Sequence, residues 1–404
     1  MPVVGRTIYL DHAASSPLRP EAIRAMQALM EPDGPFANPA SVHRPGRQAR
    51  RILEEVREAL ARELGANPAE IVFTSGGTEA DNLAVMGAAR GALRRWGRRG
   101  IVVSAIEHHA VLEAGARLRE EGFCLEYAAC DGGGVVTPQA VSDAVGRVEA
   151  RGEAVAVIAL MLVNNEVGTR QPVPEVAELA HRVGAVLAVD AVQGPELEEL
   201  SVDRLGCDLL TLSAHKFGGP KGVGVLYVRR DLPLEPLFWG GGQERQLRPG
   251  TPNTLGIAGL GAAWRWVREN RRALVAHKAE MESRLLEGLR AQVEDVQVNG
   301  DLSRKVPGIL NLYTPGVAAE TLLVELDIEG VACSSGAACT AGSLRPSHVL
   351  LAMGLGLARA ECSVRVSVGW TTTPDEIDEA VRRMAGAIRR IRSRRGSMAE
   401  AVRR

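Results

Sequence analysis

The sequence predicts a doubly wound α/β fold, followed by a smaller region that combines a few strands with helices. Segments with helical periodicity alternate with short apolar runs rich in β-branched residues, which is the pattern of alternating helices and strands. Each of these apolar runs ends in polar residues. The pattern changes after the Gly- and Pro-rich stretch at 240–254, where a long helical segment is expected from near Leu260.

The first region opens with a helix and a strand that lead into a glycine turn. Ile52, Leu53, Val56, Leu60 and Leu64 form one apolar stripe, and Gly65 ends this helix. The run IVFTS at 71–75 is then a strand, and GGTEADNLAVMGAAR at 76–90 is a turn that opens a helix. Further strands are expected within 101–109, 154–166, 184–193, 207–216 and 222–228.

The polar residues that end these strands point to one shared crevice. In open α/β sheets, ligands bind beyond the carboxyl ends of the strands. Solvent-exposed loops would explain polar residues at the end of one strand. Here, however, five successive strands end with amide, acid, imidazole or amine groups. We therefore expect the following residues to converge: Thr74, Ser75, Glu107, His108, Asn164, Asn165, Asp190, Gln193, Ser213, His215 and Lys216.

The second region carries shorter strands and ends in a helix. Strands are expected at 296–300, 308–314 and 330–335. Thr373 and Pro374 start the last helix, whose buried stripe is Ile377, Val381, Met384 and Ile388. Its Arg-rich end at 389–404 is either a solvated helix end or a segment that docks a partner.

The composition is that of an ordinary globular protein. The 404 residues are 46% hydrophobic and 24% charged, and the formal net charge of -1 argues against nucleic-acid or acidic membrane partners. No apolar run approaches the roughly 18 residues of a membrane span, and the N-terminus lacks a signal-peptide pattern. We expect a cytoplasmic enzyme.

Neither disulfides nor a zinc site are expected. The six cysteines are too few for a disulfide framework in a chain of this length, and no Cys-x-x-Cys or His-Glu-x-x-His motif occurs. His108 and His109 are adjacent, which on a helix separates their directions by about 100° and disfavours binding of one metal by both.

Two of the chain's four lysines, Lys216 and Lys221, lie in the Gly-rich stretch LSAHKFGGPKGVG at 212–224. Arginine stays protonated at ordinary pH, whereas a lysine in a dry pocket can lose its proton and attack a carbonyl group. Both lysines are equally compatible with an ordinary loop. The stretch therefore holds a candidate nucleophile that composition alone does not establish.

A glycine turn and an acid accompany this amine. Gly76 and Gly77 lie at a strand-to-helix bend, which favours a bound phosphate, although many such turns contain glycine without binding one. Asp190 either caps the next segment or keeps a heteroaromatic nitrogen protonated. Amine, acid and phosphate turn together are what pyridoxal phosphate requires, and His108 would then stack on its ring or be an ordinary histidine.

Nine motifs carry a resemblance that extends from Tyr9 to about residue 380: YLDHAASSP, NPASVHRPGRQAR, FTSGGTEADNLAV, EHHAVL, NNEVGTRQP, VDAVQ, SAHKFGGPKGVG, GGGQERQLRPGT and SSGAACTAGSLRPSHVLLAMG. With these motifs the chain resembles the pyridoxal-phosphate-dependent cysteine desulfurases of the class V aminotransferases, in the branch that serves iron–sulfur cluster and nitrogenase assembly. NPAS and SSGAAC each carry alanine where serine is commoner, and neither change removes a group that the chemistry needs.

The resemblance implies the fold of type I pyridoxal-phosphate-dependent transferases. The large domain would cover residues 18–262 and contain a mostly parallel seven-stranded sheet flanked by helices. The small α+β domain would comprise residues 1–17 and 263–404. It would carry the catalytic cysteine, Cys339, on a mobile loop at about 333–345.

The resemblance also assigns the cofactor site. Lys216 would hold pyridoxal 5'-phosphate covalently, Asp190 would face the pyridine nitrogen, and Gln193 the phenolic oxygen. His108 would stack above the ring as a catalytic residue, with Asn165 nearby. The phosphate would be bound by Gly77, Thr78, Ser213, His215 and, from the neighbouring subunit of a homodimer, Thr251.

The substrate site rests on three further positions. Arg365 in SVRVSVG would bind the α-carboxylate through bidentate hydrogen bonds from its guanidinium group. From the residues alone, an arginine at the surface or at a strand edge explains this position nearly as well. Asn38 and Asn165 would complete the substrate site. Cys339 would accept the sulfur and is a candidate transient ligand of a cluster, whereas Cys333 has the context of a small buried hydrophobic residue.

The implied reaction converts L-cysteine to L-alanine and leaves a persulfide on Cys339, which passes sulfur to an acceptor protein such as an iron–sulfur scaffold. Another enzyme of this fold, such as a selenocysteine lyase or an aminotransferase, would share Lys216 and Asp190 without needing Cys339. A dinucleotide dehydrogenase is disfavoured because GGPKGVG precedes a strand instead of following one. A non-catalytic binding subunit is disfavoured by the full set of cofactor-type residues.

Overall fold

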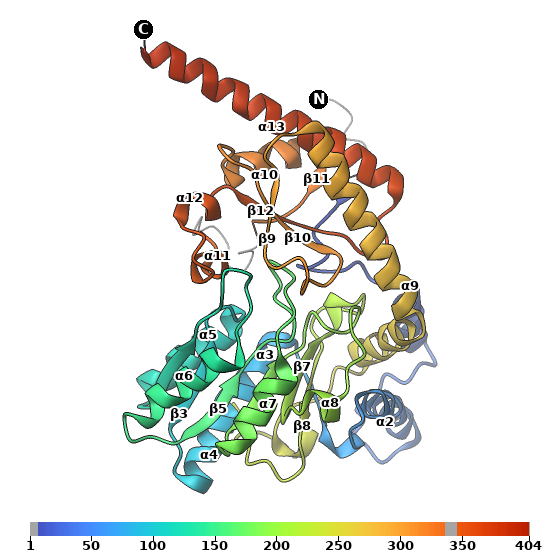
Figure 1. Cartoon of the computed structure of the whole chain (residues 1–404). Coiled ribbons are helices and arrows are strands. Elements are labelled where there is room, and N and C mark those ends of the chain that lie inside the picture. Colours follow the sequence, from blue (N-terminus) through green and yellow to red (C-terminus); the bar gives the residue numbers. More distant parts are fainter. Residues whose placement is uncertain (1–6, 336–345, 404) are drawn as a thin grey trace.

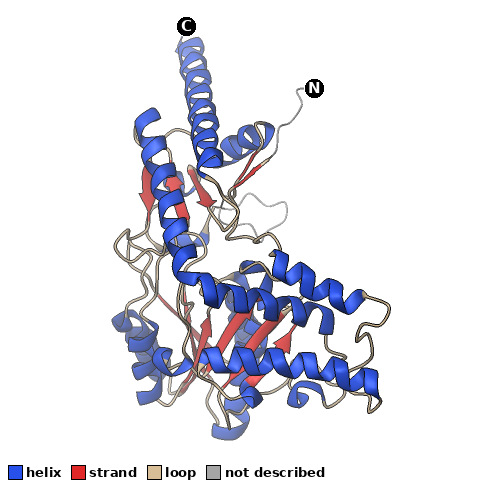
Figure 2. Ribbon diagram, turned by 90° about the vertical axis from the view of Figure 1, so that its right-hand side faces the viewer, coloured by secondary structure: helices blue, strands red, loops and turns tan. Residues whose placement is uncertain are grey.

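The computed structural model describes residues 7–335 and 346–403. A seven-stranded sheet with helices on both faces forms its larger part, in the lower half of Figure 1 and seen between layers of helices in Figure 2. The strand order is β2-β8-β7-β6-β5-β3-β4. The strands are β2 (Ile71–Thr74), β3 (Gly100–Ser104), β4 (Cys124–Ala128), β5 (Val155–Ala159), β6 (Val186–Asp190), β7 (Leu209–Ser213) and β8 (Gly224–Val228).

The sheet is mostly parallel, as predicted. Strands β3 to β7 run parallel to one another, and β8 runs antiparallel to the two strands beside it, β2 and β7. The carboxyl ends of the five parallel strands therefore lie at one edge of the sheet. Because ligands of such sheets bind at this edge, the topology already places a site there.

Alternate residues of each strand enter two different cores. Val102, Ile158 and Leu210 pack into a core on one face, whereas their neighbours in sequence, Val103 and Val157, belong to the core on the other face. The first face is covered by α2 (Arg44–Leu64), α6 (Pro138–Glu149), α7 (Val173–Arg182) and α8 (Val202–Leu205). The second face is covered by α3 (Gly77–Asn82), a π-helical turn (Leu83–Gly87), α4 (Ala88–Trp96) and α5 (His109–Glu120).

A smaller unit lies above the large sheet in Figure 1. Its antiparallel sheet has the order β12-β10-β9, and a two-stranded parallel sheet joins β1 to β11. The strands are β1 (Ile8–Tyr9), β9 (Gln297–Asn299), β10 (Ile309–Tyr313), β11 (Val331–Ala332) and β12 (Ser363–Ser367). Its helices include α10 (Ala319–Ile328), α11 (His348–Ala352), α12 (Leu357–Ala360) and α13 (Pro374–Arg403).

Helix α9 (Thr254–Gln292) connects the two units. Its first half buries Leu260 and Trp264 in the core of the large sheet, and its second half buries Met281 and Leu285 in the core of the smaller unit. Helix α1 (Pro20–Met30) packs along α9. The expected boundary between residues 262 and 263 falls inside α9, and the domain division stays a prediction.

The local patterns mark most of these elements. Helix α2 ends at Gly65, whose φ of 72° lies in the left-handed region that glycine adopts without strain. Helix α9 starts at Thr254, earlier than the expected start near Leu260, because Asn253 caps it by accepting a hydrogen bond from the Gly256 N–H. Strands β1, β4 and β12 were not predicted; β4 lies at the sheet edge, with Tyr127 partly exposed.

The basic end of α13 packs on acidic residues of α10. Arg390 pairs with Glu325 and Glu329, and Arg394 also pairs with Glu325, 2.6 Å away. These two arginines therefore form ion pairs within the chain. In the described part of the chain, no helix combines the length and the apolar character needed to cross a bilayer.

A buried charge network joins the two units beside the sheet. Glu196, in the loop after β6, pairs with Arg19 and with Lys278 of α9, the latter at 2.6 Å. All three side chains are less than one-tenth exposed, and Arg19 also lies 3.8 Å over the ring of Trp266. Burial alone would raise the pKa of Glu196, but Lys278 and Arg19 hold this pKa below its ordinary value.

We predict that Glu196→Ala lowers stability by about 3–5 kcal/mol, because two buried cations lose their counter-ion. The matched control is Glu199→Ala, whose partner Arg204 and own side chain are both mostly exposed, and whose cost should stay within about 1 kcal/mol. Urea unfolding followed by circular dichroism measures both. Equal losses in the two variants would contradict the role of the buried network.

Candidate active site

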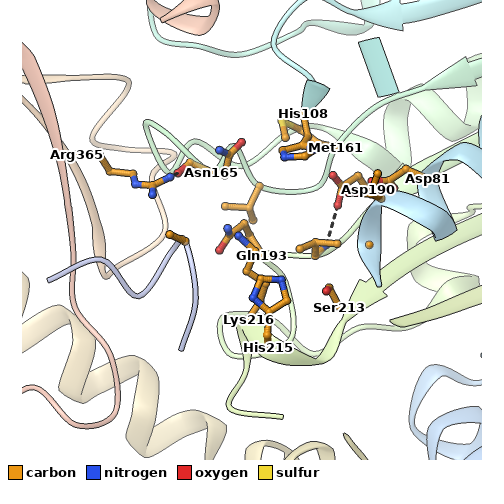
Figure 3. A pocket seen from close by; sticks show the side chains of 15 residues that line it. Asp81, His108, Met161, Asn165, Asp190, Gln193, Ser213, His215, Lys216 and Arg365 are labelled. Atoms are coloured by element: carbon orange, nitrogen blue, oxygen red, sulfur yellow. Dashed lines mark hydrogen bonds between the residues drawn. The ribbon is translucent and has the colours of Figure 1, made fainter. Parts of the chain in front are cut away.

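A cavity of about 290 Å³ opens where the parallel strands end, between the large sheet and β12. Figure 3 shows its side chains, with Arg365 on one side and Asp190 on the other. The loops that follow β2, β3, β5, β6 and β7 all contribute to it. The lining residues are Ala14, Gly77, Thr78, Asp81, His108, Met161, Val163, Asn165, Asp190, Val192, Gln193, Ser213, His215, Lys216 and Arg365.

The turn between β2 and α3 lines part of the cavity, and it packs so closely on β8 that position 224 requires glycine. A Cβ atom on Gly77 would lie 3.1 Å from Cγ2 of Val192. A Cβ atom on Gly224 of β8 would lie 2.5 Å from the carbonyl carbon of Gly76. The Thr78 and Ser213 hydroxyl groups line the same part, together with the start of a helix, so this part offers donors suited to a phosphate.

Two acidic side chains, Asp190 and Asp81, line the cavity on the side away from Arg365 (Figure 3). The carboxylate of Asp190 accepts a hydrogen bond from the Val192 N–H at 2.9 Å and lies on the cavity. Burial raises the pKa of Asp190, and it raises the pKa of neighbouring Asp81 further, with a contribution from the charge of Asp190. A cation or a protonated ring nitrogen is the partner that such acids lack.

His108 lies over the cavity as a neutral imidazole. It caps α5 by accepting a hydrogen bond from the Ala110 N–H at its Nδ1, 3.1 Å away. Burial, followed by the positive charge of Lys216, lowers the pKa of His108 to about 4. An uncharged ring in this position can stack on a flat ligand or exchange a proton through Nε2.

Lys216 closes the floor of the cavity from a short 3-10 turn (Ala214–Lys216) after β7. Its Nζ donates to the carbonyl oxygen of Ala13 at 2.6 Å, and Nε2 of Gln193 donates to the same oxygen at 2.9 Å. The adjacent His215 has Nδ1 3.3 Å from the Ser15 hydroxyl, and burial with the charge of Lys216 lowers its pKa to about 4. The amine of Lys216 therefore lies next to residues of the large sheet and of the N-terminal segment.

Arg365 enters the cavity from β12 of the smaller unit. Its side chain is only 2% exposed. Nη1 donates to the carbonyl oxygen of Asn165 at 2.8 Å, and Nη2 pairs with Asp11 at 2.8 Å. Its buried Nε has no hydrogen-bond partner within the residues that the structure describes. A carboxylate ligand in the cavity would suit this guanidinium.

The structure brings together most residues that the sequence predicted. The expected cofactor residues all line this cavity except Thr251, which is exposed on the loop before α9. Asn38 is exposed as well, and its Oδ1 accepts a hydrogen bond from the Ala40 N–H at 2.9 Å. Cys339 lies outside the described residues. The roles given to these residues stay predictions.

Several lining residues were missed by sequence reasoning, namely Ala14, Asp81, Met161, Val163 and Val192. Asp81 carries a usable signal, because it lies four residues after Gly77 and so one helical turn into the helix that the glycine turn opens. Cys333 lies near Arg365 but is unsuited to nucleophilic attack, since burial and the charge of Asp11 raise its pKa to about 12.

Comparison with known proteins agrees with this architecture. The family model for aminotransferase class V matches residues 8–380. An IscS-like cysteine desulfurase of Mycobacterium tuberculosis is 40% identical over 398 residues, which cover 97% of this chain and 98% of the relative. The similarity therefore extends over both units of the structure.

Two solved structures share the fold. One, of a NifS-like protein, has a TM-score of 0.85 and 32% sequence identity, and the match covers 94% of this chain and 98% of that one. The other, of SspA in complex with cysteine, has a TM-score of 0.76 and 32% identity, and the match covers 89% and 98%.

Glu107, just before His108, should make stability depend on pH. Its Oε1 accepts a hydrogen bond from the Met161 N–H at 2.7 Å, and its Oε2 is buried without a partner among the described groups. Burial, with a contribution from Asp190, raises the pKa of Glu107 from 4.5 to about 8. Between these values the unfolded chain ionises and the folded chain does not, so rising pH favours unfolding.

We predict that Glu107→Gln removes this dependence, because an amide cannot ionise. The urea midpoint of the variant should rise relative to wild type as the pH increases from 4.5 to 8. Glu113→Gln, at an exposed position of α5, is the control and should follow wild type. A constant difference between Glu107→Gln and wild type over this range would refute the raised pKa.

Proposed function

The chain belongs to the aminotransferase class V family and is a cysteine desulfurase, and from this premise we propose that it takes sulfur from L-cysteine with pyridoxal phosphate held on Lys216. The observation that carries the proposal is the convergence of an amine, an acid and a buried arginine on one cavity of about 290 Å³. Each of these groups comes from a different strand end or sheet.

The cavity has residues that fit both the phosphate and the ring nitrogen of the cofactor. When bound, pyridoxal phosphate supplies an aldehyde that links to amines and a pyridine ring that accepts electrons from the α-carbon of an amino acid. Thr78 and Ser213 would bind the phosphate, and the absence of a side chain on Gly77, next to Ser213, leaves room for it. Asp190 would pair with the ring nitrogen, which supplies the positive charge that its buried carboxylate lacks.

The remaining residues would act on the substrate. Arg365 would bind the α-carboxylate, and Asn165 lines the wall beside it. Lys216 would take the proton from the α-carbon, because its amine lies on the cavity, where it donates a hydrogen bond to the carbonyl oxygen of Ala13. His108, uncharged at neutral pH, would face the reacting atoms from above.

Sulfur transfer would use Cys339. Its thiolate would attack the sulfur of the substrate, so that an S–S bond forms and the bond between that sulfur and the β-carbon breaks. The electron pair of the broken bond is protonated at the β-carbon, which gives L-alanine and an enzyme persulfide. No external oxidant or reductant is needed.

The proposed assembly is a homodimer in the cytoplasm, in which the exposed Thr251 of one subunit would bind the phosphate held by the other, and Asn38 would complete the substrate site. The persulfide would pass to an acceptor protein for iron–sulfur cluster, tRNA-thiolation or other thio-cofactor synthesis. Residues 18–262 would form the cofactor domain, and residues 1–17 and 263–404 the smaller domain.

The proposal predicts that Cys339→Ala keeps the yellow cofactor and binds L-cysteine but releases no sulfide with dithiothreitol as acceptor. The rate of sulfide release should fall at least about a hundredfold, since the variant lacks the thiol on which the proposed persulfide forms. Cys333→Ala is the control and should release sulfide at close to the wild-type rate, because that thiol has a pKa of about 12. Normal turnover by Cys339→Ala would contradict the proposed function.

A further inference from the structure

The segment between β1 and Pro17 forms a tight turn that touches both functional cations of the cavity. The Tyr9 hydroxyl lies 3.0 Å from the carbonyl oxygen of Asp11 and 2.7 Å from that of Ser15, so it bridges the two ends of the turn. Within the turn, the Ala14 N–H donates to the Asp11 carbonyl at 3.0 Å. The side chain of Asp11 and the carbonyl group of Ala13 then point at different partners.

These partners are Arg365 and Lys216. The carboxylate of Asp11 pairs with Nη2 of Arg365 at 2.8 Å, while the Ala13 carbonyl accepts from Nζ of Lys216 at 2.6 Å. The turn is held against β12, because the Ala13 N–H donates to the Ser367 hydroxyl at 2.9 Å and Asp11 forms a parallel bridge with Ser367. The carboxylate of Asp11 is thus fixed beside Arg365 by backbone contacts that do not involve Arg365.

We propose that Asp11 is the resting counter-ion of Arg365 and sets how tightly the enzyme binds the α-carboxylate of its substrate and product. This inference rests on the proposed function, since it assumes that Arg365 is the carboxylate-binding group. It adds a positioning residue on the far side of the guanidinium, in a motif whose individual side chains the sequence analysis left without a role.

The argument starts from the burial of Arg365. A guanidinium that is 2% exposed needs compensation for its lost hydration, and Asp11 supplies the one ion pair that it makes among the described residues. Glu166 is the other carboxylate near Arg365, but its Oε2 accepts a hydrogen bond from the Ser347 hydroxyl at 2.5 Å, and burial raises its pKa. Glu166 is therefore the weaker source of negative charge.

A bound carboxylate changes this balance. Arg365 alone would carry one positive charge and attract a substrate carboxylate strongly in a pocket of low dielectric. With Asp11 fixed on Nη2, two carboxylates share one guanidinium, and the repulsion between them offsets part of the attraction. Arg365 lines the cavity, so its guanidinium is placed to receive the incoming group. The consequence is weaker binding of L-cysteine and easier release of L-alanine.

The decisive variant is Asp11→Asn, which keeps the shape and an oxygen that can accept from Nη2 but removes the charge. L-alanine and ethylamine are the paired ligands, since they differ by the carboxylate group. Each would be titrated into the holoenzyme, and its Kd taken from the change in cofactor absorbance. Asp143→Asn, at an exposed position of α6, is the control for a simple change in net charge.

We expect the Kd of L-alanine to fall on the order of tenfold in Asp11→Asn, with the Kd of ethylamine and both values in Asp143→Asn unchanged. In turnover, the KM for L-cysteine should fall without a rise in kcat. An unchanged or higher Kd for L-alanine in Asp11→Asn would overturn the inference, and so would an equal shift for both ligands. A wild-type enzyme without cofactor absorbance or a response to L-alanine would instead refute the proposed function.

Discussion

The parallel arrangement of β3, β5, β6 and β7 is the constraint on which the rest of the site depends. Parallel strands must all end at one edge, so the loops that follow them are brought together although they lie far apart in sequence. His108, Asn165, Asp190 and Lys216 owe their proximity to this topology and not to any local motif. The antiparallel β8 supports the arrangement, because Gly224 allows the β2–α3 turn to pack against it.

Burial then gives these groups their chemistry. The same desolvation lowers the pKa of His108 and raises that of Asp190, so the imidazole is neutral and the acid is poised for a positively charged partner. Arg365 of the smaller unit forms the opposite wall of the cavity. Asp11, in the N-terminal turn, pairs with this arginine. Helix α9 and the buried Glu196 hold that unit against the sheet, so the stability of the junction and the geometry of the site are linked.

The sequence allowed much of this to be predicted, for reasons that particular residues make clear. Apolar runs that end in polar residues predicted both the strands and the position of the active-site cavity. The same residues end a strand and line the site, as Asp190 does. The contact of Asp11 with Arg365 was not predictable, since it joins residues 354 apart through the bridge between Asp11 and Ser367 of β12 and leaves no periodic pattern. Asp81 was missed because a polar residue on a helix is ordinarily solvated.

The central claim is that Lys216, among the four lysines of the chain, holds the cofactor. Borohydride reduction of the purified holoenzyme, followed by proteolysis and peptide mass mapping, tests it directly. The account predicts that the mass of the reduced cofactor appears on the peptide containing Lys216 and not on those containing Lys278 or Lys305. Its appearance on another lysine, or its absence from every peptide, would contradict the account.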